Sequence, residues 1–308
     1  MRRWLLAIVA VASALAFAFA CVPADTRPTP GTLTLTVSPS TAVANGVMTT
    51  DGWQVVFERV LVGIGDGSLS DQCTVYGEAN YDRLLDVTHD AGQKLGILHG
   101  IGQCDLRFRV SAPSSDAILG EGVAQSDADR LRARAGDAYV PLGGVAVELT
   151  GTATRAGVTK HFTISFRPRI RYGGCGLVPD AGVPAVDLES NVDLVYDIAI
   201  EAEAMLRTDV DAAAPLRFDP FAQADVDGDG IVTLDELRGV PIESVRDGGP
   251  FEAGTFDYDE DAGVIRRGRP LVIVSFGDYV YELLLPTLAR FRDNGFCVVS
   301  SQQRPAND

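Results

Sequence analysis

Alternation of apolar and polar residues with a period of two recurs along this chain and limits its fold class. Residues 32–37 alternate threonine with leucine or valine, and residues 53–62 form a longer, more apolar run. Such segments are typical of strands with one buried face. Further segments of β type lie at 106–110, 145–149, 161–166 and 191–204. Many short strands separated by Gly, Pro, Asp and Ser predict an antiparallel β-sandwich rather than a parallel sheet with crossover helices.

Residues 225–236 form the motif with the clearest chemical meaning. Acidic side chains stand at positions one, three, five and twelve, with Gly230 at position six and Val232 at position eight. This is the pattern of an EF-hand calcium loop, because Ca²⁺ takes six to eight oxygen ligands and the glycine permits the sharp bend. The predicted ligands are the carboxylates of Asp225, Asp227, Asp229 and Glu236, the carbonyl of Ile231, and an oxygen or bound water at Thr233.

The alternative for this segment is an Asp- and Gly-rich surface turn that holds no metal. Four carboxylates in register favour the calcium loop, and Thr233 with Glu236 also forms a capping box that starts the exit helix where an EF-hand requires it. Pro220 and Pro241 limit the flanking helices to about one turn each, whereas sensor loops come in pairs between long helices. We therefore expect a structural clamp rather than a switch. A second acidic segment, 257–262, lacks glycine at position six.

Short helices are expected around this loop and near the C-terminus. Asp219 followed by Pro220 is typical of an N-cap and a first helical residue, and residues 278–293 have apolar residues near helical spacing, with a kink expected at Pro286. The expected class is β-rich α+β: an antiparallel β-sandwich in residues 32–186. Residues 187–301 would supply a strand, the EF-hand loop and a C-terminal helix packed on the sandwich.

The N-terminus predicts export and a lipid anchor. Arg2 and Arg3 precede an apolar run to Ala20, so residues 1–20 are typical of a signal peptide. Residues 18–21 resemble a bacterial lipobox, whose last residue here is Cys21. Residues 21–31 are rich in Pro and Thr and are predicted to form a lipid-anchored tether. An ordinary signal peptide that happens to precede a cysteine is the alternative. The expected localisation is the cell envelope, with the outer membrane preferred and the lipid bilayer as partner of the acyl anchor.

The chain has five cysteines, and lipidation of Cys21 would leave an even number. In an oxidising compartment four cysteines allow two disulfides in three possible connectivities. Sequence does not choose among the three, and we take Cys73 with Cys104 and Cys175 with Cys297 as the working prediction.

The net charge is strongly negative and excludes one class of partner. The formal charge is −16, and loss of two arginines with the signal peptide would make it −18. Such a surface repels nucleic acid and anionic lipid. We therefore expect no nucleic-acid partner, and most of the charge serves solubility.

Several short sequence phrases stand out along the mature chain. They are Asp-Gly-Trp at 51–53, Gly-Thr-Ala-Thr at 151–154, Lys-His-Phe at 160–162, Arg-Tyr-Gly-Gly-Cys at 171–175, Leu-Arg-Phe at 216–218 and Gly-Phe-Cys at 295–297. Their order resembles that in uncharacterised secreted lipoproteins of myxobacteria and related predatory or social bacteria. The resemblance spans most of the mature chain. It implies an envelope location and a single calcium loop, and no settled activity.

The preferred function is a non-catalytic, calcium-binding surface or periplasmic module that binds an envelope protein or polymer. The chain has no Gly-x-Ser-x-Gly motif, no phosphate-binding Gly-rich loop and only three histidines, none with zinc-site spacing. The alternative is a calcium-stabilised enzyme that acts on an envelope or extracellular polymer.

Overall fold

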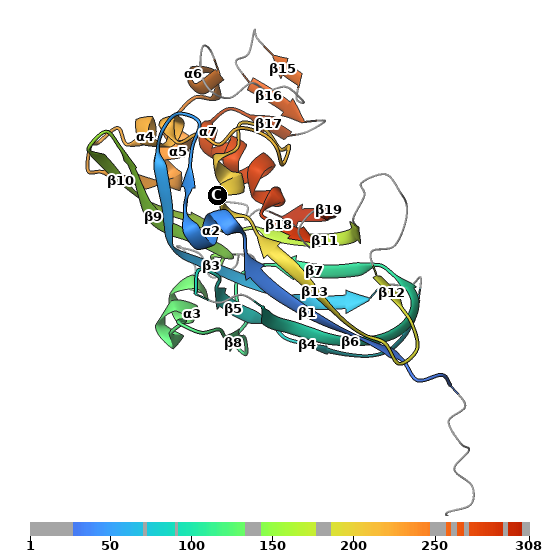
Figure 1. Cartoon of the computed structure of the whole chain (residues 1–308). Helices are drawn as coiled ribbons and strands as arrows, with labels where there is room; N and C mark the ends of the chain where they lie inside the picture. The colour runs from blue at the N-terminus through green and yellow to red at the C-terminus, as the bar shows by residue number, and fades with distance from the viewer. Residues whose placement is uncertain are drawn as a thin grey trace, which may run out of the picture.

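The computed structural model describes residues 27–69, 73–89, 92–132, 143–176, 186–246, 257–259, 264–267, 271–291 and 295–303. The expected signal peptide, Cys21 and the first part of the tether lie outside these residues. Two large sheets and a few short helices make up most of the described chain (Figure 1). The predicted β-rich class is therefore confirmed, and the paired sheets are consistent with a sandwich.

The first sheet has six strands in the order β12-β6-β1-β13-β18, with β4 paired beside β6. Its strand β1 shows the predicted alternation, because Leu33, Leu35 and Val37 are buried. The strands are β1 (Gly31–Pro39), β4 (Thr74–Asn80), β6 (Gln93–Cys104), β12 (Val186–Leu188), β13 (Asp193–Ile200) and β18 (Ala289–Phe291). The expected boundary between residues 186 and 187 falls inside β12, and both large sheets contain strands from either side of it.

The second sheet has ten strands, with the main order β14-β10-β9-β3-β7-β11-β19. Its strands are β2 (Val47–Met48), β3 (Gln54–Leu69), β5 (Arg83–Asp86), β7 (Leu106–Val110), β8 (Ile118–Leu119), β9 (Val147–Arg155), β10 (Val158–Phe166), β11 (Arg169–Gly176), β14 (Ile231–Thr233) and β19 (Phe296–Gln303). A small third sheet contains β15 (Asp257–Asp259), β16 (Val264–Arg267) and β17 (Leu271–Ile273).

The large sheets are mixed rather than purely antiparallel, which corrects the prediction. β1 pairs with β13 in parallel, and so do β10 with β14 and β5 with β8. Parallel neighbours need a long crossover between them. Between β1 and β13 the crossover is built largely from strands of the second sheet, a pairing that the period-two pattern does not encode.

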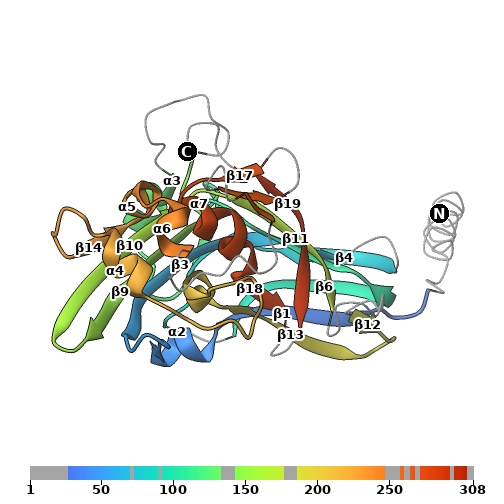
Figure 2. The same cartoon turned by 90° about the horizontal axis from the view of Figure 1, so that it is seen from above.

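One apolar core joins both sheets and the short helices. It includes Leu35 of the first sheet, Phe57 of the second and Phe221 beside the loop. A smaller cluster packs helix α3 against β5 through Leu131 and Leu84. The helices are α2 (Thr41–Asn45), α3 (Gln125–Arg132), α4 (Asp219–Ala224), α5 (Leu234–Gly239), α6 (Ile242–Arg246) and α7 (Phe276–Tyr279), with a 3₁₀ helix η1 at Ala202–Leu206. Figures 1 and 2 show α4 to α7 gathered over one end of the molecule.

The predicted C-terminal helix is shorter and less regular than expected. After α7 the chain forms a π-helical turn at Val280–Leu284 and a 3₁₀ turn at Leu285–Thr287, and it enters β18 at Ala289. Pro286 lacks the N–H that would continue the helical ladder and clashes with the preceding turn. The prediction of helix through residue 293 is therefore wrong, and a strand that closes the edge of the first sheet replaces its end.

Two disulfides are present, and their pairing is the one predicted. Cys73 pairs with Cys104 and joins the start of β4 to the end of β6, neighbours in the first sheet. Cys175 pairs with Cys297, residues 122 apart in sequence, and joins β11 to β19. The second bridge therefore fixes the C-terminal strand at the edge of the ten-stranded sheet.

Candidate metal centre

The acidic loop 225–236 lies between helices α4 and α5 and is anchored to the ten-stranded sheet. Its strand β14 pairs in parallel with β10, and the backbone N–H of His161 donates to the carbonyl of Gly230 at 2.8 Å. Val232 is fully buried, as its place at position eight predicts, and Leu237 of α5 is buried with it. These two buried side chains anchor the second half of the loop in the core.

Backbone N–H groups bind the carboxylates and curl the loop. The Asp225 carboxylate accepts from the N–H groups of Gly228 and Gly230 at 2.9 and 3.0 Å. Both glycines have positive φ, 75° and 83°, a conformation that costs other residues energy. The Asp229 carboxylate accepts from Ile231 N–H at 2.7 Å in the same way. The Asp-x-Asp-Gly-Asp-Gly sequence therefore determines the turn locally.

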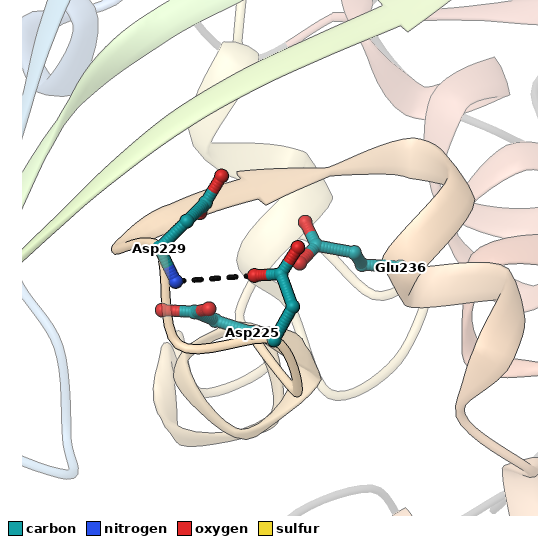
Figure 3. A group of neighbouring side chains, drawn as sticks. Asp225, Asp229 and Glu236 are labelled. Atoms are coloured by element: carbon teal, nitrogen blue, oxygen red, sulfur yellow. Dashed lines mark hydrogen bonds between the residues drawn. The ribbon is translucent and has the colours of Figure 1, made fainter.

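Four carboxylates converge in this loop. Asp225, Asp227, Asp229 and Glu236 each offer an oxygen, and these oxygens all lie within 4.8 Å of one another. Figure 3 shows that Asp225 and Glu236 point toward one another across the loop. Charges so close repel each other unless a cation lies between them. The group can hold a metal ion with hard oxygen ligands.

Glu236 connects the group to helix α5. One carboxylate oxygen, Oε2, accepts from Thr233 N–H at 2.7 Å and from Thr233 Oγ1 at 2.9 Å. Thr233 Oγ1 in turn accepts from Glu236 N–H at 3.3 Å, so the predicted capping box is present. The other oxygen, Oε1, is buried and has no hydrogen-bond partner in the described part of the chain. Burying a carboxylate oxygen without a partner costs folding free energy. A cation bound in the loop would be a partner for this oxygen.

Lys160 of β10 provides positive charge beside the loop. Its ammonium group contacts Asp225 Oδ2, and the side chain of Asp225 is fully buried. The hydrogen bond from Lys160 lowers the pKa of Asp225, assisted by the N–H groups of Gly228 and Gly230. Asp225 is therefore held ionised, the form that ligates a metal. The sequence pattern gave no reason to include Lys160, because it lies on a strand far from the loop in sequence.

The ligand roles of Thr233 and Ile231 stay predictions: the Thr233 hydroxyl takes part in the capping box, and Ile231 is about 40% exposed on β14. One predicted helix cap is corrected. Asp219 is not the N-cap of α4. Phe218 takes that position, and Asp219 instead accepts from Trp53 Nε1 at 2.9 Å.

Asp51, which sequence reasoning missed as a site residue, caps helix α4 from a distant part of the chain. Its Oδ2 accepts from the N–H groups of Phe218 and Asp219 at 2.9 and 2.8 Å. Arg155 contacts the Asp219 carboxylate at 2.7 Å. Because α4 ends where the loop begins, these contacts position Asp225, the first of the predicted ligands. The only signal in the sequence was the Asp-Gly-Trp phrase before β3.

In comparisons with known proteins, no family model, curated protein or solved structure matches the chain. Among the residues that the structure describes, no helix has the length and apolar character needed to cross a membrane. The interpretation of the site therefore depends on the residues and contacts given above.

Proposed function

We propose that this protein is an exported envelope lipoprotein with a β-sandwich fold and an EF-hand-type calcium site, and that it acts as a non-catalytic binding module. The observation that carries the calcium assignment is the convergence of four carboxylates, one of which, Glu236, has a buried oxygen without a hydrogen-bond partner among the described residues. Four converging carboxylates suit Ca²⁺, because Ca²⁺ takes six to eight oxygen ligands in flexible geometry. Mg²⁺ requires a near-ideal octahedron of ligands and gives up its bound water reluctantly.

The calcium has a structural role in this proposal. Helices α4 and α5 have six residues each, and Ala224 and Leu237 anchor them in the core. A calcium sensor exposes a groove when two long helices change their angle, and these helices are too short and too firmly packed for that. Binding would instead relieve carboxylate repulsion and fix β14 against β10.

Export and lipidation are supported by the signal-like residues 1–20 and by the two disulfides. Disulfides persist in oxidising compartments such as the periplasm and the cell surface, and four of the five cysteines are used in them. The remaining cysteine, Cys21, is then available for an acyl anchor. The order of sequence phrases shared with myxobacterial lipoproteins supports the same location.

Thermal melting combined with small-angle X-ray scattering tests the calcium role. Purified protein is compared in about 1 mM Ca²⁺, about 1 mM Mg²⁺ and chelator, the range in which extracellular calcium modules bind. We expect Ca²⁺ to raise the melting temperature by about 2 to 3 °C, with little effect of Mg²⁺ and no change in radius of gyration. An unchanged melting temperature would rule out the calcium site, and a large change in radius would favour a switch.

A further inference from the structure

A pocket of about 690 Å³ opens on the ten-stranded sheet, among β3, β7, β11 and β19. Its lining includes Arg107, Arg109 and Arg171, with Asp66 and Asp105 as the acidic members. The lining has three guanidinium groups and two carboxylates in a chain whose formal charge is −16, and Asp82 beside Arg109 makes the local balance neutral. An anion is therefore repelled less here than by the acidic surface elsewhere.

Strand geometry brings the three arginines to one face. Arg107 and Arg109 are two residues apart on β7, and Arg109 is directly opposite Arg171 of β11 in the antiparallel register. Alternate residues of a strand share a face. On the opposite, buried face Phe108 and Tyr172 stack with ring centroids 4.7 Å apart. The arginine backbone positions are therefore fixed by core packing directly beneath them.

The three guanidinium groups differ in how far they are neutralised. Arg109 is engaged by Asp66 and by Asp82, the latter at 3.4 Å, and its side chain is mostly buried. Arg107 has one ion pair, to Asp105 at 3.3 Å, and about half of its side chain is exposed. Arg171 is exposed, and its guanidinium has no hydrogen bond or ion pair with any described residue. Arg171 therefore carries the charge that is free to meet a ligand.

We propose that this pocket binds a small anionic saccharide, with Arg171 and Arg107 holding its oxyanion. A guanidinium forms paired hydrogen bonds with a carboxylate or a phosphate, so a uronic acid and a sugar phosphate share the required chemistry. Asp66 and Asp105 repel a second oxyanion and accept from hydroxyl groups. Ser68 of β3 and Ser300 of β19 add polar groups to the wall. The volume is within the range of small-molecule sites.

This inference rests on the proposed binding role and is independent of the calcium loop. The test is calorimetric titration of the full mature chain with three probes: digalacturonic acid, glucose 6-phosphate and neutral cellobiose. We expect at least one anionic probe to bind at low millimolar concentration or tighter, more weakly as salt rises, and cellobiose not to bind. The anionic probe that binds distinguishes a carboxylate ligand from a phosphate ligand. Equal binding of cellobiose, or binding of neither anion, overturns the proposal.

Two variants on one strand make the test specific. Arg171→Ala should weaken binding of the anionic probe at least about tenfold, since hydrogen bonds to charged groups are worth that much, and Arg171→Lys should give an intermediate loss. Arg169→Ala is the matched control: it removes the same charge two residues earlier on β11, outside the pocket lining, and should weaken binding by at most about twofold. Equal losses in both variants, or none with Arg171→Ala, would contradict the assignment.

A calcium arm separates this proposal from the one before it. The same titrations are repeated in chelator after melting curves show that each variant is folded at the assay temperature. We expect anion binding to be unchanged by calcium removal. If calcium does not shift the melting temperature but the anionic probe binds, only the calcium site is rejected. If calcium shifts the melting temperature but no anionic probe binds, only the pocket is rejected.

Discussion

Replacement of Glu236 by glutamine separates the calcium contribution of this side chain from its structural one. The two carboxylate oxygens of Glu236 differ: Oε2 completes the capping box with Thr233, and Oε1 is buried without a hydrogen-bond partner among the described residues. A glutamine keeps an oxygen that can accept from Thr233 and has nearly the same shape. It loses the charge and the bidentate ligation that position twelve provides to calcium.

The expected size of the effect follows from mass action. Extracellular EF-hand modules bind calcium at about 0.1 to 1 mM. At about 1 mM Ca²⁺ and the tighter end of that range, binding stabilises the folded state by about 1.4 kcal/mol. For a chain of this size, with an unfolding entropy of about 2.1 cal/mol/K per residue, that corresponds to about 2 to 3 °C in melting temperature. Glu236→Gln should lose most of this gain.

The assay is a set of melting curves for wild type and variant, each in calcium and in chelator. In chelator the variant should be at least as stable as wild type, because one of four mutually repelling charges is gone and the capping box remains. Asp235→Asn is the control: the neighbouring carboxylate is 92% exposed and lies outside the converging group. If Glu236→Gln lowers the melting temperature equally in calcium and in chelator, the side chain is purely structural and the calcium argument fails.

Three further predictions concern the anchor, the long disulfide and a buried acid. Cys21 should carry a thioether-linked diacylglycerol in the mature protein, and an unmodified Cys21 in intact-mass analysis would contradict this. Replacing Cys175 and Cys297 together by serine should reduce the free energy of unfolding by about 5 kcal/mol from chain entropy across the 122-residue separation, as read from urea denaturation; a loss below about 1 kcal/mol would contradict that account. Burial, together with the nearby Glu201 carboxylate, raises the pKa of Glu203. The contribution of Glu203 to the free energy of unfolding is therefore complete in acid and is lost as the pH rises through the raised pKa. Glu203→Gln should flatten the dependence of melting temperature on pH above about 4.5, and an unchanged slope would show that Glu203 is not its source.

Local patterns predicted the elements that bury one face of a regular strand. Residues 32–37 and 106–110 became β1 and β7 because their alternation matches the pleat and needs no distant partner to be recognised. β6 was missed because Gly96, Gly100 and Gly102 interrupt its apolar face. The neighbouring strand β4 explains two of these glycines. A Cβ at Gly96 would lie 3.1 Å from the carbonyl oxygen of Ala79, and a Cβ at Gly100 would lie 3.1 Å from that of Thr74.

The candidate metal site was predictable for a related reason: its ligands lie within twelve consecutive residues and the turn forms from local hydrogen bonds. The groups that support the loop come from elsewhere. Lys160 is brought by β10, and Asp51 reaches α4 from the turn before β3. The arginine pocket was not foreseen at all, because its members become neighbours only through the registers of β3, β7 and β11. Sequence spacing carries no information about such registers.

The order of the ten-stranded sheet places the acidic loop near one end and the long disulfide near the other. β14, which belongs to the loop, forms one end of the main strand order, and β19 forms the other. End strands are paired on one side only, and β14 has just three residues. At one end the proposed calcium ion would hold β14 against β10, and at the other Cys175–Cys297 ties β19 to β11. Because Arg171 lies on β11, the strand that the disulfide joins to β19, we expect the proposed anion pocket to depend on the disulfide and not on the metal.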